Sequence, residues 1–140
     1  MTGYIANTDQ SWFEFLRHQP AQEEVNFWNP SGRNVFRGKI GSPFIFRLKA
    51  PINMIGGFGL VSWADRMPDW LAWECFGQGN GAPTLEAMRG QIQRLRDRSD
   101  IREGSGVDQI GCIILSQPVF LPRELWIPPT HRLEESQPSV

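Results

Sequence analysis

The sequence predicts one α+β domain. Its 140 residues suit a single core, since a chain of this size buries roughly two-thirds of the surface that it exposes when unfolded. Strand patterns and helix patterns both occur, in separate segments. The proportions of 40% hydrophobic and 21% charged residues are those of a globular protein, whereas six Trp and nine Phe against one Tyr predict a core rich in aromatic rings.

The N-terminal part predicts a strand, a helix and a loop. β-Propensity favours a strand over residues 3–7. Asp9 can then cap a helix, because its carboxylate can accept hydrogen bonds from the free amides of the first turn, and Pro20 ends that helix at the latest. After residues 25–28, Asn-Pro and Ser-Gly pairs predict a loop. The apolar side of the helix comprises Trp12, Phe13, Phe15 and Leu16.

Two strands follow and predict a hairpin-like unit. Residues 43–49 alternate in polarity, with Phe44, Phe46 and Leu48 on one face, which is the period-2 pattern of a strand. Residues 54–63 resume as a second strand. Glycines interrupt it, and glycines inside a strand mark a bulge, a bend or a close approach of another backbone. These glycines are Gly56, Gly57 and Gly59.

The next segments predict two helices and a loop. Residues 68–76 form a short helix that stops at Gly77, and Thr84 caps a longer helix. Residues 99–108 are polar and contain glycine, which predicts a flexible loop. The residues available for burial are Trp70, Leu71, Trp73 and Cys75 in the first helix and Leu85, Met88, Ile92 and Leu95 in the second. The side of the second helix that is expected to face solvent comprises Arg89, Gln93, Arg94, Arg96 and Arg98.

The C-terminal part predicts the last strands and the end of the domain. Residues 110–116 are apolar on both faces, which predicts a buried strand. Short edge strands are expected at 119–121 and 125–127. We expect the domain to span 1–128, and the Pro-rich, polar residues 129–140 to form a flexible linker or tail, since such a composition cannot build a core.

The cysteine, histidine and hydropathy patterns indicate the cellular location of the protein and whether it binds a metal or a cofactor. Cys75 and Cys112 form no CxxC and lie in apolar neighbourhoods, which favours buried, reduced thiols. No signal peptide and no apolar run of the ~18 residues that a membrane span needs is present, so we expect a cytoplasmic protein. His18, His131 and the two cysteines are too widely separated along the sequence to predict a metal site. No cofactor is predicted.

Enzyme motifs are not recognisable. The glycines near residues 38–41 and 56–59 lack the spacing of phosphate-binding loops and precede strands where those loops need a helix. No Ser or Cys resembles a nucleophile beside a base. The pairs Glu23 with Glu24 and Asp65 with Asp69 are typical of solvated charges. A binding function is therefore favoured over catalysis, and no catalytic residue is predicted.

One stretch, residues 25–63, carries the strongest functional signal. It contains five basic residues and no Asp or Glu, in a chain whose formal net charge is −1. Aromatic residues lie between those charges, and flat rings beside guanidinium groups suit a partner that has both bases and phosphates. The rings are Phe27, Trp28, Phe36, Phe44, Phe46, Phe58 and Trp63.

Several motifs carry a resemblance to known families. TDQSWFEFL, EVNFWNPSG, PFIFRLKAP, AWECFG with GNGA, and IGCIILSQPVFLP with WIP cover most of the chain, from Tyr4 to Pro128. Together they resemble the N-terminal domain found ahead of HNH nuclease domains in predicted bacterial modification-dependent restriction enzymes. The order of segments, with IGGFGLV after GSPFIFRLKAP, also resembles the PUA-like superfamily and its EVE and ASCH domains.

The resemblance implies a fold and a partner. The fold would be a small, strongly bent β-barrel, PUA-like or SRA-like, with helices packed outside. Members such as SRA and YTH domains hold an extruded modified base in an aromatic pocket, where stacking offsets the cost of unstacking. The implied partner is double-stranded DNA carrying a modified base, and the HNH nuclease domain would lie outside this chain. Dimerisation through the full-length protein remains open.

Candidate site residues follow from position in such a fold. Trp28 and Trp63 are the pocket candidates with Phe27 in reserve, while Asn7 or Asp9 could read the Watson–Crick edge. The alternatives are that Trp28 plugs the barrel end and that Asp9 only caps its helix. Packing roles are expected for Trp12, Phe15, Phe44, Phe46, Trp70 and Trp73. The phosphate candidates are Ser31, Arg33, Arg37, Lys39, Arg47 and Lys49.

The leading hypothesis is a DNA-binding module that reads 5-methylcytosine or 5-hydroxymethylcytosine by base flipping and guides an HNH nuclease. One alternative is an RNA-binding PUA-like module. Another is an ASCH-like enzyme acting on a nucleoside derivative, which would need Lys49 paired with Asp9 or Glu74. A protein-interaction domain is the last. For Glu74, an exposed or salt-bridged structural role is favoured.

Overall fold

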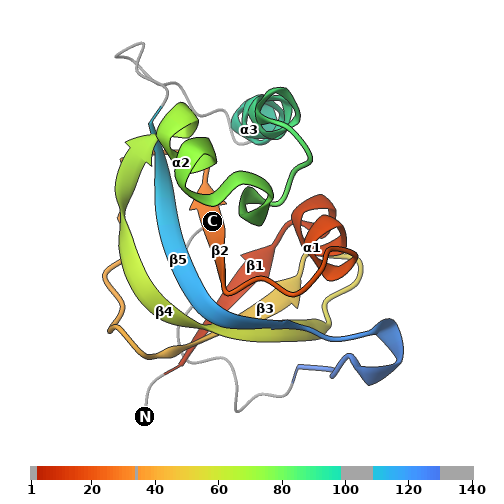
Figure 1. Cartoon of the computed structure of the whole chain (residues 1–140). Helices are drawn as coiled ribbons and strands as arrows, with labels where there is room; N and C mark the ends of the chain where they lie inside the picture. The colour runs from red at the N-terminus through yellow and green to blue at the C-terminus, as the bar shows by residue number, and fades with distance from the viewer. Residues whose placement is uncertain (1–2, 34, 99–108, 130–140) are drawn as a thin grey trace.

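The computed structural model describes residues 3–33, 35–98 and 109–129, which form a five-stranded sheet with three α-helices. The helices lie on the upper and right-hand sides of the view in Figure 1, and the long strands curve along the left. The strands are β1 (Tyr4–Thr8), β2 (Glu24–Asn29), β3 (Pro43–Leu48), β4 (Ile55–Pro68) and β5 (Gln109–Phe120). The helices are α1 (Gln10–Arg17), α2 (Asp69–Phe76) and α3 (Leu85–Arg98), with 3-10 turns η1 (Gly77–Asn80) and η2 (Arg123–Leu125).

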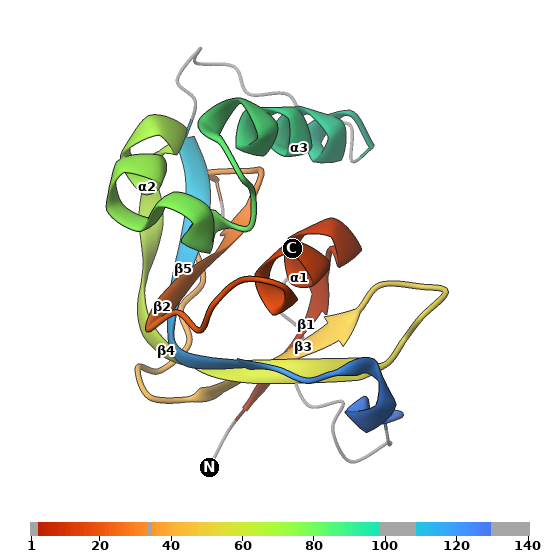
Figure 2. The ribbon, with the colours of Figure 1, turned by 45° about the vertical axis from the view of Figure 1, so that its right-hand side comes forward.

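The sheet has the strand order β1-β3-β4-β5-β2. β1 and β3 pair in parallel, and the other neighbours are antiparallel. β4 and β5 bend so that their lower halves run beneath α1 while their upper halves rise to α2 (Figure 2). β1 and β2 are edges that do not pair with each other, so the sheet is not closed and the predicted barrel is not confirmed.

The predicted strand and helix at the N-terminus are confirmed. Asp9 caps α1, because its carboxylate accepts a hydrogen bond from the Trp12 amide at 3.3 Å. α1 ends before Pro20, as expected. Trp12, Phe13 and Leu16 are buried, whereas Phe15 is only partly buried against the core.

The predicted hairpin-like unit is confirmed as β3 and β4. Phe44 and Phe46 are fully buried and lie opposite glycines of β4, which leave room for the rings. The pairing of β4 with β5 shifts register twice, after Phe58 and after Val61, and these irregularities accompany the bend. β4 also continues to Pro68, beyond the predicted end at residue 63.

Aromatic rings fill the space between α1 and the sheet. Phe27 stacks on Phe46 with ring centroids 6.1 Å apart, and Phe46 stacks on Phe120 at 5.4 Å. Trp12 meets Phe46 edge to face at 5.4 Å. Such edge-to-face and offset contacts are favourable beyond the burial of area alone. The expectation that most aromatic residues serve packing therefore holds for this cluster.

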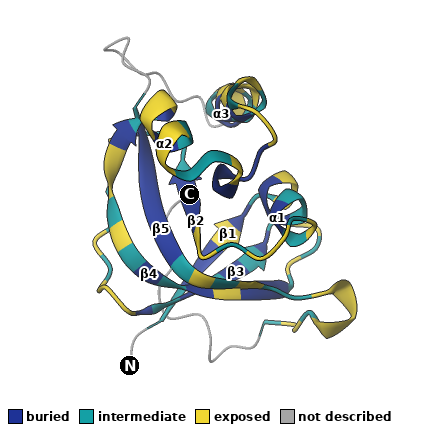
Figure 3. Ribbon diagram, viewed as in Figure 1, coloured by how far each residue is buried: buried dark blue, intermediate teal, exposed yellow. Residues whose placement is uncertain are grey.

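α2 corrects the predicted burial of its side chains. Trp70 is 53% exposed, Leu71 is 36% exposed and Cys75 is exposed, whereas Asp69 and Ala72 are the buried residues of this helix. Trp73 is partly buried against the core. α2 has apolar residues around most of its circumference, and only one side of a surface helix can face the core. Figure 3 shows the outer side of α2 as exposed.

α3 and β5 agree with prediction in most respects. The Thr84 hydroxyl caps α3 by accepting from the Ala87 amide at 3.1 Å, and the apolar side is buried. Arg96, expected on the wet side, instead donates hydrogen bonds to the carbonyls of Pro30 and Gln109, which tie α3 to the ends of β2 and β5. The buried part of β5 comprises Ile110, Gly111, Cys112, Ile113, Ile114 and Leu115.

The short edge strands expected at 119–121 and 125–127 are not separate strands in the structure. β5 runs without a break to Phe120, so 119–120 belong to it, and Ile127 makes an isolated bridge to Ile55. The expected loop at 99–108 and all but the first residue of the expected tail at 129–140 lie outside the described residues. Among the described helices, none is long and apolar enough to cross a membrane.

Candidate nucleic-acid interface

Trp28 and Trp63 lie on the same face of the sheet, on either side of β5. Trp63 pairs with Ile114, which on its other side pairs with Asn26. In the next row, Cys112 pairs with both Trp28 and Asp65. Directly opposite residues of paired strands project to the same face, so the two indoles are diagonal neighbours across one intervening strand. The two predicted pocket tryptophans therefore share a face.

The two tryptophans differ in exposure. Trp63 is 41% exposed. Trp28 is 5% exposed, and its indole N–H donates to the Asn80 carbonyl at 2.8 Å, so η1 covers it. Asn80 is itself held by its side-chain amide, which donates to the Ala72 and Gly77 carbonyls. The alternative interpretation of Trp28 as a packed plug fits this geometry, and Trp63 alone presents an open ring.

A buried polar cluster beneath η1 was not predicted from the sequence. The Asn26 amide donates to Asn80 Oδ1 at 2.9 Å and contacts Cys112 Sγ at 3.2 Å. Burial raises the pKa of the Cys112 thiol to about 11, so this thiol stays protonated near neutral pH. The available signal was a single Asn inside the apolar VNFW segment, since a buried polar side chain needs a partner.

Phe27 belongs to the core. It is 4% exposed, projects to the sheet face opposite Trp28, and packs against Trp12, Phe44 and Phe46. Because alternate residues of a strand point to opposite faces, Phe27 and Trp28 cannot line the same pocket. The reserve role proposed for Phe27 as a pocket ring is therefore replaced by a packing role.

Asn7 and Asp9 lie with Arg47 and Lys49 at the carboxyl ends of the parallel strands β1 and β3. Arg47 donates from Nε and Nη2 to Asn7 Oδ1 at 3.3 and 3.0 Å. Asp9 Oδ2 is 3.5 Å from Arg94 Nη2, in addition to capping α1. The Lys49 amide donates to the Thr8 carbonyl. We call Asn7, Asp9, Arg47 and Lys49 the strand-end group.

The strand-end group and Trp63 do not form one pocket. Arg47 lies opposite Ile55, and Trp63 is eight positions further along β4. At about 3.3 Å per residue this corresponds to about 26 Å measured along the bent strand. Asn7 and Asp9 therefore lie beside the start of β4, whereas Trp63 lies in its second half. The ASCH-like enzyme alternative requires Lys49 to pair with Asp9 or Glu74. Within the described part of the chain, no ion pair joins Lys49 to either acid.

The remaining phosphate candidates lie on the loop between β2 and β3. The Ser31 hydroxyl accepts from the Arg33 amide at 3.3 Å, so it serves the loop itself. Arg37 and Lys39 are exposed. The loop returns to β4 near Trp63, because the Gly41 amide donates to the Val61 carbonyl at 2.6 Å. We call Arg37, Lys39 and Trp63 the loop-side group.

No metal site is found in residues 3–33, 35–98 and 109–129, since they contain no group of three or more His, Cys, Asp or Glu placed to hold an ion. The ion pairs between these residues join Glu14 to Arg17, Asp69 to Arg89, and Asp9 to Arg94, and a protonated His18 would add a pair with Glu14. Arg37, Lys39, Arg47 and Lys49 take part in none of them. These four cations of residues 25–63 therefore have no acidic partner among the described residues.

Comparison with known proteins places the fold. No protein-family model matches the chain, and no curated protein matches it. The crystal structure of an ASCH protein from Zymomonas mobilis aligns with 90% of this chain and 82% of that chain, at 12% identity and a TM-score of 0.51. Two point mutants of that protein align with TM-scores of 0.51 and 0.50.

The chain therefore has a fold similar to that of this ASCH protein. At 12% identity the likeness concerns the fold alone. The resemblance to domains that precede HNH nucleases gains no support from these structures.

Proposed function

We propose that this protein is a nucleic-acid-binding module. The observation that carries the proposal is the unpaired charge of the basic stretch. Four cations, Arg37, Lys39, Arg47 and Lys49, take part in none of the ion pairs between described residues, although the whole chain has a formal net charge of −1. Phosphate groups are the natural partners of such cations, and neutralising them releases condensed counterions.

Trp63 supplies the base contact in this proposal. It is 41% exposed and lies two positions after Val61, whose carbonyl accepts a hydrogen bond from Gly41 of the loop that also carries Arg37 and Lys39. Stacking of one base on an exposed ring contributes about 1–3 kcal/mol and tolerates any base. The loop-side group thus combines a ring with two cations, the pairing that a base and its flanking phosphates require.

The finer proposal is that the base read at Trp63 is a cytosine carrying a 5-methyl or 5-hydroxymethyl group, in duplex DNA. A substituent on the base edge can be sensed fully when the base leaves the stack. The proposal includes an HNH nuclease domain as the functional partner, in keeping with the resemblance of the motifs. RNA binding through the same group is the alternative that the experiment must separate.

The test is a fluorescence-anisotropy titration against four labelled probes of equal length: methylated duplex, unmodified duplex, single-stranded DNA and single-stranded RNA. We expect the methylated duplex to bind several-fold tighter than the unmodified duplex, and log Kd to rise linearly with log salt concentration. Tighter binding of the single-stranded RNA than of the methylated duplex would favour the RNA-binding alternative. Equal, salt-independent signals for all four probes would refute a nucleic-acid function.

Variants test whether the loop-side group binds the nucleic acid. Trp63→Ala should remove the preference for modified DNA, and Arg37→Ala with Lys39→Ala should weaken all probes alike and lower the salt slope. Trp70→Ala and Arg123→Ala are the matched controls, because Trp70 is an exposed indole on α2 and Arg123 an exposed cation of η2. A control variant as damaging as Trp63→Ala would contradict the assignment.

A further inference from the structure

A separate cavity of about 210 Å³ opens where the end of α1 meets the start of β2 and the end of β5. Its walls include the apolar side chains of Leu16, Val25 and Phe120. Gln19 and Gln22, from the turn after α1, and Arg17 add polar groups. None of these residues belongs to the loop-side group or the strand-end group, so the cavity is independent of the proposed interface.

The volume limits the ligand to one ring. An engineered apolar cavity of about 150 Å³ holds benzene, and pockets for drug-sized ligands start at about 300 Å³. A cavity of about 210 Å³ therefore suits a six-membered ring with one or two small substituents, and a fused double ring with its substituents does not fit as well. Apolar walls formed by Leu16, Val25 and Phe120 suit the faces of a flat ring.

Gln19 and Gln22 are the uncharged residues of the wall with polar side chains, and Gln22 Oε1 lies beside Gly79 of η1. Both residues are half-buried, and neither side chain makes a hydrogen bond within the described part of the chain. A primary amide offers a donor and an acceptor side by side, which is the complement of a ring edge with the same pair, as when Gln reads adenine. The cavity thus matches a ligand with an amide-like edge.

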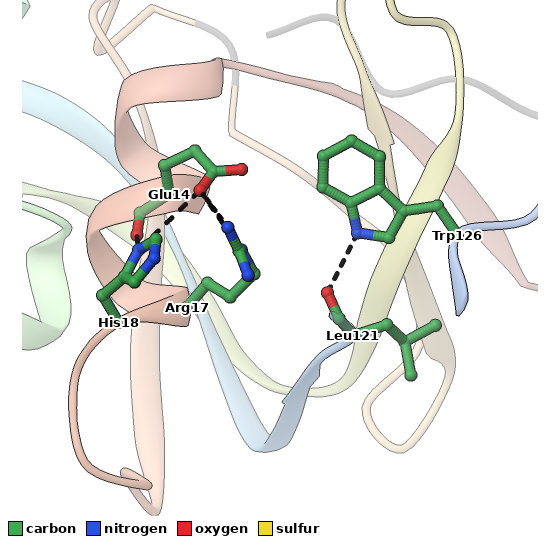
Figure 4. Close-up of polar contacts among 5 residues, drawn as sticks. All are labelled: Glu14, Arg17, His18, Leu121 and Trp126. Atoms are coloured by element: carbon green, nitrogen blue, oxygen red, sulfur yellow. Dashed lines mark hydrogen bonds and ion pairs between the residues drawn. The ribbon is translucent and has the colours of Figure 1, made fainter. Parts of the chain in front are cut away.

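The charge of Arg17 is already balanced. Its Nη2 and Nε donate to Glu14 Oε2 at 2.7 and 3.1 Å, and both side chains are less than a quarter exposed. Figure 4 shows this pair on α1, across from the segment that holds Leu121 and Trp126. A guanidinium engaged with a carboxylate does not call for an anionic ligand. The cavity therefore favours an uncharged ligand over a phosphate or a carboxylate.

We propose that this cavity binds an uncharged, planar, single-ring ligand with an amide-like edge, of the pyrimidine or pyridine-carboxamide class. The three properties come from separate observations: one ring from the volume, a donor and acceptor edge from Gln19 and Gln22, and neutrality from the Arg17 pair. Binding there needs neither Trp63 nor the basic stretch, so it stands or falls independently of nucleic-acid binding at the loop-side group.

The test is an NMR titration of the whole chain with uracil, nicotinamide, adenine and ribose as separate probes. We expect saturable shifts of the Leu16 and Val25 methyl resonances with uracil or nicotinamide, weaker shifts with adenine and none with ribose. The uracil and nicotinamide arms separate the two sources of the same chemistry. No saturable shift with either probe, or equal binding of ribose, would overturn the proposal.

Variants at exposed or half-buried positions keep the fold intact. Gln19→Ala and Gln22→Ala should each weaken binding several-fold, and Ala21→Phe, at an exposed position in the wall, should fill the cavity and abolish binding. Gln93→Ala is the control, because Gln93 is exposed on α3 and its amide bonds only Asp97 among the described residues. Unchanged affinity in all three cavity variants would refute the site.

Discussion

Cys112 and Cys75 differ in exposure and hence in reactivity. Cys112 is 2% exposed, and burial raises its pKa to about 11, whereas Cys75 is exposed on α2. The thiolate is the reactive form, so at pH 8 only about one Cys112 in a thousand is ionised. We expect iodoacetamide to alkylate Cys75 in the folded protein and Cys112 only after denaturation. Peptide mass spectrometry checks this, and equal labelling of the two in the folded protein would contradict it.

Asp69 and Arg89 form the ion pair in which one partner is buried and the other is not. Arg89 donates to both carboxylate oxygens, at 2.8 and 3.1 Å, and the side chains are 5% and 48% exposed for Asp69 and Arg89. Removing the arginine leaves a buried charge without this partner, which is costly, whereas removing the aspartate leaves a guanidinium that water can reach. The two halves of the pair are therefore not equivalent for stability.

We predict that Arg89→Met lowers the free energy of unfolding by about 2–3 kcal/mol, below the usual range for a buried pair because Arg89 is half-exposed. Asp69→Asn should cost less, since an amide oxygen still accepts from Arg89. Urea unfolding measures both. Arg98→Met, at an exposed arginine of the same helix, is the control and should be close to neutral. A larger loss in Asp69→Asn than in Arg89→Met would contradict this account.

At the scale of elements, periodicity decided what could be predicted. β3 and α3 bury the residues that their patterns indicated, because each has a strong contrast between its two sides. α2 has little contrast, so the sequence could not indicate which of its rings face the core. The site shows the same limit, since η1 covers Trp28 through a hydrogen bond between positions 52 apart, and no local pattern reports such a contact.

The bend of β4 depends on glycines that another backbone approaches. A Cβ on Gly57 would meet the Val119 carbonyl of β5, whereas a Cβ on Gly90, in α3, would meet nothing within 4 Å. Gly57→Ala must therefore displace β5 or part the two strands, while Gly90→Ala only removes flexibility from a helix. The same substitution should have opposite effects at the two positions.

We predict that Gly57→Ala destabilises the fold by about 1–3 kcal/mol and that Gly90→Ala stabilises it by about 0.5–1 kcal/mol. Thermal and urea unfolding of the two variants beside the parent protein measure these changes. Destabilisation by Gly90→Ala of the same size as that by Gly57→Ala would show that the contact with Val119 is not what matters.

At the scale of the whole molecule, local sequence patterns could not predict the order of the strands in the sheet. The elements could be read in sequence, but the parallel pairing of β1 with β3 and the placement of β2 at the far edge depend on packing between distant segments. The expected barrel came from a resemblance. The sheet has the expected strong bend (Figure 2), but its edge strands β1 and β2 do not pair, so it does not close.

The strand order predicts a pattern of amide hydrogen exchange. β3, β4 and β5 have a neighbour on each side, whereas β1 and β2 have a free edge. Amides exchange through local and global opening, and edge strands open at a lower free energy than central ones. We expect the slowest exchange in the buried part of β5 and in its β4 partners, and faster exchange in β1. Protection in β1 equal to that in β5 would contradict the description of β1 as a free edge.

The connection between β4 and β5 has a consequence for how the chain folds. These two strands form the longest pairing of the sheet, yet residues 69–108 separate them along the chain. Only β3 and β4 are joined by a short turn. Closing a long loop loses chain entropy before its contacts form, so high contact order slows folding. Refolding should therefore be slower than that of a helical bundle of the same length, with the β3–β4 hairpin forming early and the closure of β4 on β5 setting the rate.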